Sequence, residues 1–504
     1  MMSTLRNSMS NPYVLVAVTA IASPCILVLI RVGKSYLYPE NLPPMVEDSI
    51  GYTLAQMSSS RSPFFMEEML HKYGHIYRLF MPIWDPWYVI CDPKLARIIL
   101  EGDKSKEVAG ADKALHIYQR HAATTDNILS MFIKSTFDKS YEIVRKGTAP
   151  SFSKNNIIKR KSHLHYVASE FCHIVGQHAD NNIILNNVET WCLKLTMDFI
   201  TSSMFGKNFN SLNGHIEDDI ALFINEIDFV LKEVALKQFM NPLRQYMFWL
   251  PDVIRQKQLS KCFMNMAKRL MNEYREKIAK REIERDSAPL LDRLIRVPYS
   301  SEDSRAADFI MYLVAGHDTT AYQLAHVISQ IAKHPDVMKK LQIELDDMIS
   351  APNEPIEPDV IEKLTYMDCA IKEAMRLVPV AGLGSLRQNG CGIHYNGLYI
   401  PKGVTVAIPF YAMFRNASIR EPTSYLPERW LPGDKEEAVL QELFIPFSSG
   451  KRNCIAQNLA VWELQLFVAT LFRNFNFELA NDIDYEYFLT FKPSNLNLKV
   501  SRRY

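Results

Sequence analysis

Hydrophobic residues recur every three or four positions over much of the chain, which is the spacing of one face of an α-helix. The longest such run predicts a helix over residues 304–334, ending before Pro335. The residues that share its apolar face are Ala306, Phe309, Ile310, Leu313 and His317. A second run predicts a helix over residues 357–377.

Alternating aromatic and branched residues predict short β-strands in two places. Residues 76–93 have the pattern of a hairpin, interrupted by Pro82 and Pro86. Residues 386–408 form a second strand-rich region, punctuated by turn sequences such as Asn396-Gly397. The whole pattern therefore predicts a mainly α-helical body with small antiparallel β-sheets. Since no linker interrupts residues 46–504, we expect them to form one domain.

The N-terminal region has a different pattern. Residues 13–32 carry no charge before Arg31, and about 20 apolar residues in a helix can cross a bilayer. We therefore expect residues 1–32 to be a membrane anchor, with the body on the cytoplasmic side because Lys and Arg are more frequent after the span. The alternative is a signal peptide cleaved after Ala20-Ile21-Ala22. The proline-rich residues 33–45 suit a stiff linker.

Composition and charge exclude several classes of protein. The 504 residues are 48% hydrophobic and have a formal net charge of +1, so no overall field attracts nucleic acid, and we expect no such partner. The eight cysteines are scattered, without a CxxC pair or a Cys/His cluster. This spacing argues against a zinc module and against a disulfide framework.

One cysteine nevertheless has a suggestive position. Cys454 follows a loop that contains Gly450 and Arg452, and it precedes a run of helical period. At a helix N-terminus the free N–H groups, the dipole and cationic neighbours favour thiolate over thiol. A stabilised thiolate is a nucleophile or a soft metal ligand. The alternative is a small buried residue beside a turn, and a thiol hydrolase would also require a histidine base that the sequence does not identify.

The sequence AGHDTT at residues 315–320 places a glycine, an acid and two hydroxyl groups in the middle of the longest predicted helix. Glycine costs about 1 kcal/mol against alanine in a helix, so a compensating role is expected. A Thr319 hydroxyl bonded to the carbonyl of Ala315 would open one helical turn and leave space for a small ligand beside Gly316. Alternatively, Gly316 ends one helix and Asp318 or Thr319 caps the next.

Motifs in a fixed order resemble those of the cytochrome P450 family. FSSGKRNC, residues 447–454, resembles the family's cysteine loop F-x-x-G-x-R-x-C, although Ala456 stands where the family usually has glycine. AGHDTT resembles the oxygen-binding motif A-G-x-[DE]-T-[TS]. Glu373 and Arg376 resemble the family's E-x-x-R, and Arg429 in PERW resembles their partner. The resemblance implies the cytochrome P450 fold for residues 46–504.

The resemblance also implies roles for individual residues. Cys454 would be the metal ligand, bound to the iron of haem b, and Asp318 and Thr319 would deliver protons to dioxygen. Glu373, Arg376 and Arg429 would form a buried structural ion-pair group. The residues implied to bind the cofactor are Cys454, Arg452, Phe447, Gly450, Arg145, Tyr141, Arg387, Ala315, Gly316 and Ala456. Tyr141 departs from the tryptophan that is common at its position.

The activity that the resemblance implies is insertion of one oxygen atom of O2 into a lipophilic small molecule at the endoplasmic reticulum membrane. Sterol, fatty acid, terpenoid and xenobiotic substrates all fit. The electron donor would be an NADPH-dependent flavoprotein reductase, docked on Lys139, Arg145, Lys146 and Lys451. The pocket is expected to be lined by residues 104–130, 310–316, 380–386 and 487–491.

Two other functions fit the same motifs. A haem-thiolate isomerase or dehydratase would rearrange an oxidised lipid without O2 or a reductase. A haem-binding sensor or carrier without catalytic activity would need neither Thr319 nor an electron donor.

Overall fold

The computed structural model describes most of the chain after residue 40. The described residues are 41–81, 86–103, 108–110, 112–113, 138–238, 244, 246–285, 287–349, 355–416, 418–487 and 489–504. The anchor expected at residues 1–32 and most of the linker expected at residues 33–45 lie outside them. Among the described residues, no helix combines the length and apolar character needed to cross a bilayer.

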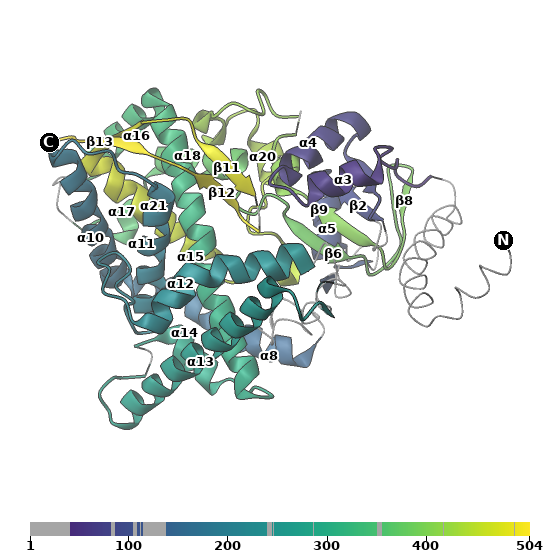
Figure 1. Ribbon diagram of the computed structural model, residues 1–504. Helices are drawn as coiled ribbons and strands as arrows, with labels where there is room; N and C mark the ends of the chain where they lie inside the picture. Colours follow the sequence, from purple (N-terminus) through teal and green to yellow (C-terminus); the bar gives the residue numbers. More distant parts are fainter. Residues whose placement is uncertain are drawn as a thin grey trace, which may run out of the picture.

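The body has a helical part and a smaller part built on a β-sheet (Figure 1). The smaller part contains α3 (Ile50–Met57), α4 (Ser62–Tyr73) and α5 (Pro93–Glu101). The helical part encloses the largest hydrophobic core, and two further cores lie against the sheet. The mainly helical architecture predicted from the sequence is confirmed.

The main sheet has five strands in the order β1-β2-β9-β6-β5. Strands β1 (Ile76–Leu79) and β2 (Trp87–Ile90) form the predicted antiparallel hairpin. Strand β6 (Ser385–Gln388) pairs antiparallel with β9 (Thr405–Ile408). One pair departs from the expected antiparallel pattern: β2 and β9 run parallel, with Tyr88 opposite Val406. Parallel neighbours need a long connection, and most of the chain separates these two strands.

The other sheets are two-stranded and antiparallel. Strand β7 (Ile393–Tyr395) joins β8 (Leu398–Ile400) through the predicted Asn396-Gly397 turn, where both residues have positive φ. The other two-stranded sheets pair β3 (Gly102–Asp103) with β4 (Val108–Ala109), β10 (Phe475–Leu479) with β13 (Leu498–Arg502), and β11 (Asp484–Tyr487) with β12 (Phe491–Ser494). Strand β5 (Asp112–Lys113) belongs to the main sheet.

The central helix α15 (Glu302–Lys333) passes through the middle of the helical part (Figure 1). Its bounds agree with the predicted 304–334 to within two residues. Ser301 caps its start by accepting from the backbone N–H of Ser304 at 3.1 Å, and Pro335 follows its end. Helices α11 (Val188–Met204), α13 (Pro251–Ala279), α18 (Thr365–Leu377) and α21 (Gln457–Asn474) pack around it.

The single helix predicted over residues 357–377 is wrong. The structure has α17 (Pro358–Ile361), a turn, and then α18. The carboxylate of Glu344, from α16 (Pro335–Met348), accepts from the backbone N–H groups of Tyr366 at 2.7 Å and Met367 at 2.9 Å. These donors at the start of α18 would otherwise be unsatisfied. A distant side chain therefore fixes where the second helix begins.

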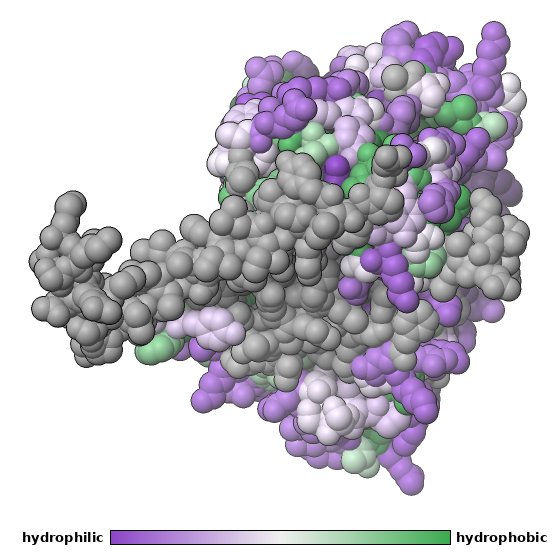
Figure 2. All heavy atoms as spheres, turned by 90° about the vertical axis from the view of Figure 1, so that its right-hand side faces the viewer, coloured by the Kyte–Doolittle hydropathy of each residue, from purple (hydrophilic) through white to green (hydrophobic). Residues whose placement is uncertain are grey.

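The remaining helices cover the core and connect its layers. Figure 2 shows one face on which hydrophobic side chains gather in small groups among hydrophilic ones. The remaining helical elements are α8 (Lys139–Thr148), η2 (Ala149–Phe152), α9 (Lys154–Ile158), α10 (Lys161–Asp180), α12 (Asp218–Leu231), η3 (Lys232–Gln238), α14 (Pro289–Arg296), α19 (Phe410–Phe414), η5 (Pro427–Trp430), α20 (Glu437–Leu443) and η6 (Gly450–Arg452).

Candidate haem site and its supporting network

The cysteine loop folds back on itself just before α21. The backbone N–H of Cys454 donates to the carbonyl of Phe447 at 2.9 Å, which closes the turn. Helix α21 begins at Gln457, with Ala456 as its N-cap residue. Cys454 therefore lies at a helix N-terminus, as the sequence predicts. Ala456 has φ −99°, a conformation that alanine adopts without strain, so the glycine expected at this position is not required.

Gly450 is required by the shape of this loop. Its φ is +72°, and a Cβ atom built there would lie 2.1 Å from the carbonyl oxygen of Leu100. Leu100 is near the end of α5, so the loop and this helix touch backbone to backbone. The Ser449 hydroxyl also donates to the carboxylate of Glu101. Gly450 thus has a backbone conformation that residues with a side chain resist.

The surroundings of the Cys454 thiol act on its pKa in opposite directions. The residue is accessible to solvent, yet the surrounding protein desolvates the thiol and raises its pKa. The backbone N–H of Ala456 and the charge of Arg145 act in the opposite direction. A backbone N–H and a cation therefore favour thiolate, as expected, but desolvation outweighs them. A metal cation at the sulfur would reverse this balance.

Helix α8 brings two of the predicted cofactor residues to the cysteine loop. The Arg145 guanidinium donates to the backbone oxygen of Asn453 at 3.0 Å and to its side-chain oxygen at 2.8 Å. The Arg452 guanidinium lies 3.6 Å from the ring centroid of Tyr141, which is a cation–π contact. Asn453 was not singled out from the sequence, where only its position next to Cys454 marks it.

Strand β6 brings a third arginine to the same loop. Arg387 is buried, and its guanidinium donates to the hydroxyl of Ser448 at 3.2 Å. Arg145, Arg387 and Arg452 thus come from three separate segments and gather around residues 447–454. A set of guanidiniums of this kind suits an anionic group.

The basic surface expected to dock a reductase is only partly available. Lys139, Lys146 and Lys451 are exposed, and Lys146 pairs with Glu142 at 2.6 Å on the same helix. Arg145 is half-buried and turned toward Asn453. Arg145 therefore supports the loop instead of extending into solvent.

The central helix has a small solvent-accessible patch at the AGHDTT sequence, formed by Ala315, Gly316 and Thr319, which we call the notch. Most residues of α15 are buried, but Ala315 is exposed, and Gly316 and Thr319 are partly exposed. The Thr319 hydroxyl donates to the carbonyl of Ala315 at 2.8 Å, as predicted. Because α15 is continuous through this region, the alternative of two capped helices is excluded.

Gly316 has a different structural role from the one expected. A Cβ atom built on it would lie 1.9 Å from Cδ1 of Ile200. The glycine therefore lets α11 approach α15 closely, and Ile200 occupies the position where space for a ligand was predicted. The opening lies instead at Ala315 and Thr319.

Asp318 points away from the notch. Its buried carboxylate accepts from the Thr490 hydroxyl at 2.9 Å and lies 3.9 Å from the ammonium of Lys492. Burial raises the pKa of this carboxyl, and the charge of Lys492 opposes the shift. The structure thus separates the acid from the hydroxyl of Thr319, although the two residues are adjacent on the helix.

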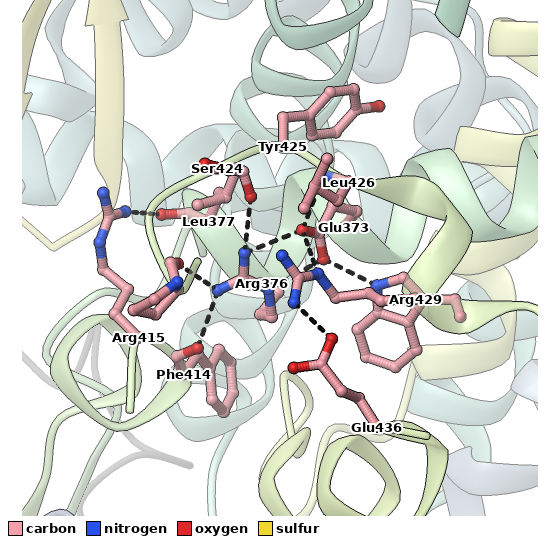
Figure 3. A network of polar contacts seen from close by, with 12 residues as sticks. Glu373, Arg376, Leu377, Phe414, Arg415, Ser424, Tyr425, Leu426, Arg429 and Glu436 are labelled. Carbon is pink, nitrogen blue, oxygen red and sulfur yellow. Dashed lines mark hydrogen bonds and ion pairs between the residues drawn. The ribbon is translucent and has the colours of Figure 1, made fainter. Parts of the chain in front are cut away.

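The predicted ion-pair group is present and fully buried (Figure 3). Glu373 accepts two hydrogen bonds from Arg376, each at 2.8 Å, and one from Arg429 at 2.9 Å. The side chains of all three residues are 0% exposed. Backbone carbonyls of Phe414, Pro422 and Ser424 accept the remaining hydrogens of Arg376.

The same network contains two members that the sequence did not identify. The indole N–H of Trp430 donates to Glu373 at 2.8 Å. Glu436 accepts from Arg429 at 2.8 Å on the side away from Glu373 (Figure 3). Trp430 lies within the PERW segment, and its position next to Arg429 was the only sign in the sequence that it belongs to this network.

Two of the predicted pocket segments join each other. The backbone N–H of Phe491 donates to the carbonyl of Val380 at 2.7 Å, and the Tyr487 hydroxyl accepts from the backbone N–H of Leu383 at 3.4 Å. Most of the segment expected at residues 104–130 lies outside the described residues.

The fold is that of a known class of haem proteins. A crystal structure of a cytochrome P450 (CYP102L1) superposes with a TM-score of 0.73 at 21% identity, covering 88% of this chain and 98% of that one. A family model described as Cytochrome P450 matches residues 49–500. The chain belongs to the cytochrome P450 family. It is a haem-thiolate monooxygenase of lipophilic substrates that depends on O2 and a redox partner.

Curated relatives agree with this assignment. Cytochrome P450 3A12 of Canis lupus familiaris is 26% identical over 86% of this chain and 84% of its own length. Cytochrome P450 3A7 of Homo sapiens is 31% identical over 56% of this chain and 57% of its own length. Lithocholate 6-beta-hydroxylase of Mesocricetus auratus is 25% identical over 87% of each chain.

Proposed function

We propose that the protein uses haem b to insert one oxygen atom of O2 into a lipophilic small molecule, with electrons from an NADPH-dependent flavoprotein reductase. The observation that carries the proposal is the closed cysteine loop, in which an accessible thiol lies at a helix N-terminus among three arginines. When bound, the haem supplies the oxygen-activating chemistry.

The residues of the loop fit such a cofactor. Cys454 offers one sulfur to the metal, and the backbone N–H of Ala456 interacts with that sulfur and lowers its pKa. Arg145, Arg387 and Arg452 supply cations for the two propionates. Phe447 and Gly450 keep the loop in the shape that presents the thiol, the first through its carbonyl and the second through its positive φ.

On the central helix, Thr319 is the group that would hold a proton beside dioxygen. Its hydroxyl is partly exposed at the notch and is oriented by the carbonyl of Ala315. Asp318 is the acid that we pair with this hydroxyl, and its side chain would have to turn from Thr490 and Lys492 toward Thr319 to supply a proton. The small side chain of Ala315 leaves room at the notch for a small molecule, and Gly316 lets α11 pack closely behind it.

The membrane and the reductase enter the proposal from the sequence. The apolar residues 13–32 would anchor the chain in the endoplasmic reticulum membrane, and residues 33–45 would connect that anchor to one catalytic domain, residues 46–504. The exposed Lys139, Lys146 and Lys451 would attract an acidic reductase surface. Electrons must come from a partner because the sequence has no flavin or nicotinamide fingerprint.

For the substrate, sterols, fatty acids, terpenoids and xenobiotics remain the candidates. The relative from Mesocricetus auratus is named as a lithocholate hydroxylase, so a steroid acid like lithocholate is the first compound to test. A screen for substrate-induced changes of the haem spin state across these classes would identify the preferred one.

The proposal is tested by replacing the sulfur. In the haem-loaded protein, Cys454→Ser should abolish the red-shifted Soret band of the reduced carbonyl complex. Cys262→Ser, which alters an exposed cysteine on α13, should retain it. Retention of the band in Cys454→Ser would overturn the assignment of the ligand. Substrate-dependent NADPH consumption with reductase distinguishes a monooxygenase from a haem carrier or an isomerase.

A further inference from the structure

Ser448 in the cysteine loop has a backbone conformation that is unusual for a residue with a side chain. Its φ is +61°, in the left-handed region that favours glycine. Its backbone N–H donates to the carbonyl of Ile445 at 2.8 Å, while the carbonyl of the preceding Phe447 accepts from Cys454. A strained residue between two such turns persists only where its surroundings hold it.

The hydroxyl of Ser448 lies where strand β6 meets the cysteine loop. Its oxygen is 3.1 Å from the hydroxyl oxygen of Ser385, the first residue of β6. It also accepts from Nη2 of Arg387 at 3.2 Å. Ser385 and Arg387 are two residues apart on the strand, so their side chains share one face, and both are buried. One hydroxyl therefore joins the loop to two residues of the strand.

A hydroxyl group suits this position because it accepts and donates at the same time. Its oxygen accepts from the guanidinium of Arg387, and its hydrogen remains available for the oxygen of Ser385. Glycine or alanine at position 448 would remove this acceptor from a buried guanidinium, and a buried charged donor that loses its acceptor is costly. The side chain of Ser448 thus compensates for its backbone conformation.

The guanidinium of Arg387 is held from two sides. Its Nη1 donates to the carbonyl of Leu386 on the same strand at 3.1 Å, and its Nη2 donates to Ser448. The backbone at Arg387 is fixed inside the main sheet, opposite Val406 of β9 and Lys113 of β5. The sheet therefore fixes one end of this long side chain, and the cysteine loop fixes the other.

Resting on the proposed function, we propose that Ser448 is a positioning residue that orients the Arg387 guanidinium toward the anionic groups of the cofactor. Because Ser448 belongs to the loop that carries Cys454, the position of this cation is tied to that of the sulfur. A fixed cation near the cofactor disfavours the oxidised iron, which has the larger positive charge, and so raises the reduction potential.

The first test removes the hydroxyl without straining the backbone. Ser448→Gly accommodates the positive φ, so the haem-loaded protein should keep its thiolate signature. Because Arg387 is no longer oriented, the reduction potential should fall in a potentiometric titration, and haem should pass to apomyoglobin several-fold faster. Ser448→Asn should recover much of both values, since asparagine tolerates this conformation and its side-chain oxygen can accept from a guanidinium.

The neighbouring serine of the same loop provides the control. Ser449→Ala removes a hydroxyl that donates to the carboxylate of Glu101 on α5, so its reduction potential should match that of the wild-type protein. Ser448→Ala should lower the potential as Ser448→Gly does. Equal potentials in Ser448→Ala and Ser449→Ala would contradict the assigned role.

A double-mutant cycle tests whether Ser448 acts through Arg387. Arg387→Gln removes the cation and should lower the reduction potential by itself. In that background Ser448→Gly should cause no further shift, because the guanidinium that the hydroxyl orients is gone. Additive shifts in the double variant would show that Ser448 acts on the loop alone, and would overturn the proposal.

The outcomes separate this proposal from the assignment of the ligand. A wild-type protein that binds haem without the thiolate signature would overturn the proposed function. A wild-type protein with the signature, and a Ser448→Gly variant with unchanged potential and haem transfer, would overturn the role of Ser448 alone. If Ser448→Gly fails to fold, Ser385→Ala decides: it removes the other partner of the Ser448 hydroxyl and should shift the potential in the same direction, and no shift would overturn the proposal.

Discussion

Arg429 and Glu436 form a second buried ion pair beside Glu373, with Nη1 and Oε2 2.8 Å apart. The side chain of Arg429 is 0% exposed and that of Glu436 is 11% exposed. With Arg376, the buried part of the network holds two guanidiniums and two carboxylates, so its formal charge is zero. The exposed Arg420 approaches the same Glu436 carboxylate at 3.8 Å from the solvent side. Glu436 balances a charge that the E-x-x-R pair and Arg429 alone would leave uncompensated.

Removing this balance should destabilise the protein. Glu436→Gln keeps the shape of the side chain but removes its charge, so we expect the free energy of unfolding to fall by about 3 kcal/mol. Chemical denaturation followed by circular dichroism measures the change. The control is Glu478→Gln, which breaks an exposed pair with Lys499 and should leave stability nearly unchanged. Equal effects of the two variants would contradict the charge-balance argument.

Gly450 offers a test of the cysteine loop. In Gly450→Ala the new methyl group would lie 2.1 Å from the carbonyl oxygen of Leu100, so the loop or the end of α5 must move. We expect a lower haem content per chain and a weakened thiolate signature, both measured by absorbance.

The control variant Gly433→Ala separates the steric contact with Leu100 from the cost of a positive φ. Gly433 also has positive φ, at +84°, but a Cβ atom there meets nothing within 4 Å. Its substitution should cost only the backbone strain, about 1–2 kcal/mol, and should leave haem binding intact. Equal haem loss in both variants would show that the contact with Leu100 is unimportant.

Much of the fold could be predicted because it is encoded in local patterns. Helix α15 follows from its apolar spacing and from Pro335, and the β7–β8 turn follows from Asn396-Gly397. The break between α17 and α18 could not be predicted, because it depends on a carboxylate from Glu344 that lies 22 residues away. Local periodicity contains no information about such a cap.

In the candidate site, too, local features could be predicted from the sequence and tertiary contacts could not. The motif residues and the Thr319–Ala315 hydrogen bond could be predicted, since both lie within short stretches of sequence. The contact of Gly316 with Ile200 could not, because the identity of the neighbouring helix is set by the tertiary fold. Lys492 was missed for the same reason: in sequence it is an ordinary lysine on a short strand.

His326 should make stability depend on pH. This buried histidine on α15 hydrogen-bonds through Nε2 to the carbonyl of Phe491 at 2.7 Å, and Nδ1 has no hydrogen-bond partner among the described residues. Protonation would place an unsatisfied N–H and a charge in the core, and burial lowers the pKa of this histidine to about 4.

The direction of the pH effect follows from the lowered pKa of His326. Between the ordinary histidine pKa, about 6.5, and the folded value of about 4, the unfolded chain binds a proton that the folded chain does not. Stability is therefore retained above about pH 6.5 and lost as the pH falls toward 4, by about 3 kcal/mol for this group.

The variant His326→Gln tests this effect. It preserves an N–H donor for the carbonyl of Phe491 without titrating, so its free energy of unfolding should fall less steeply over this range. The partly buried His163 and His165 and the buried His317 are common to both proteins and cancel in the difference, and His215→Gln serves as the exposed control. Parallel curves for wild type and His326→Gln would mean that His326 does not cause the pH dependence.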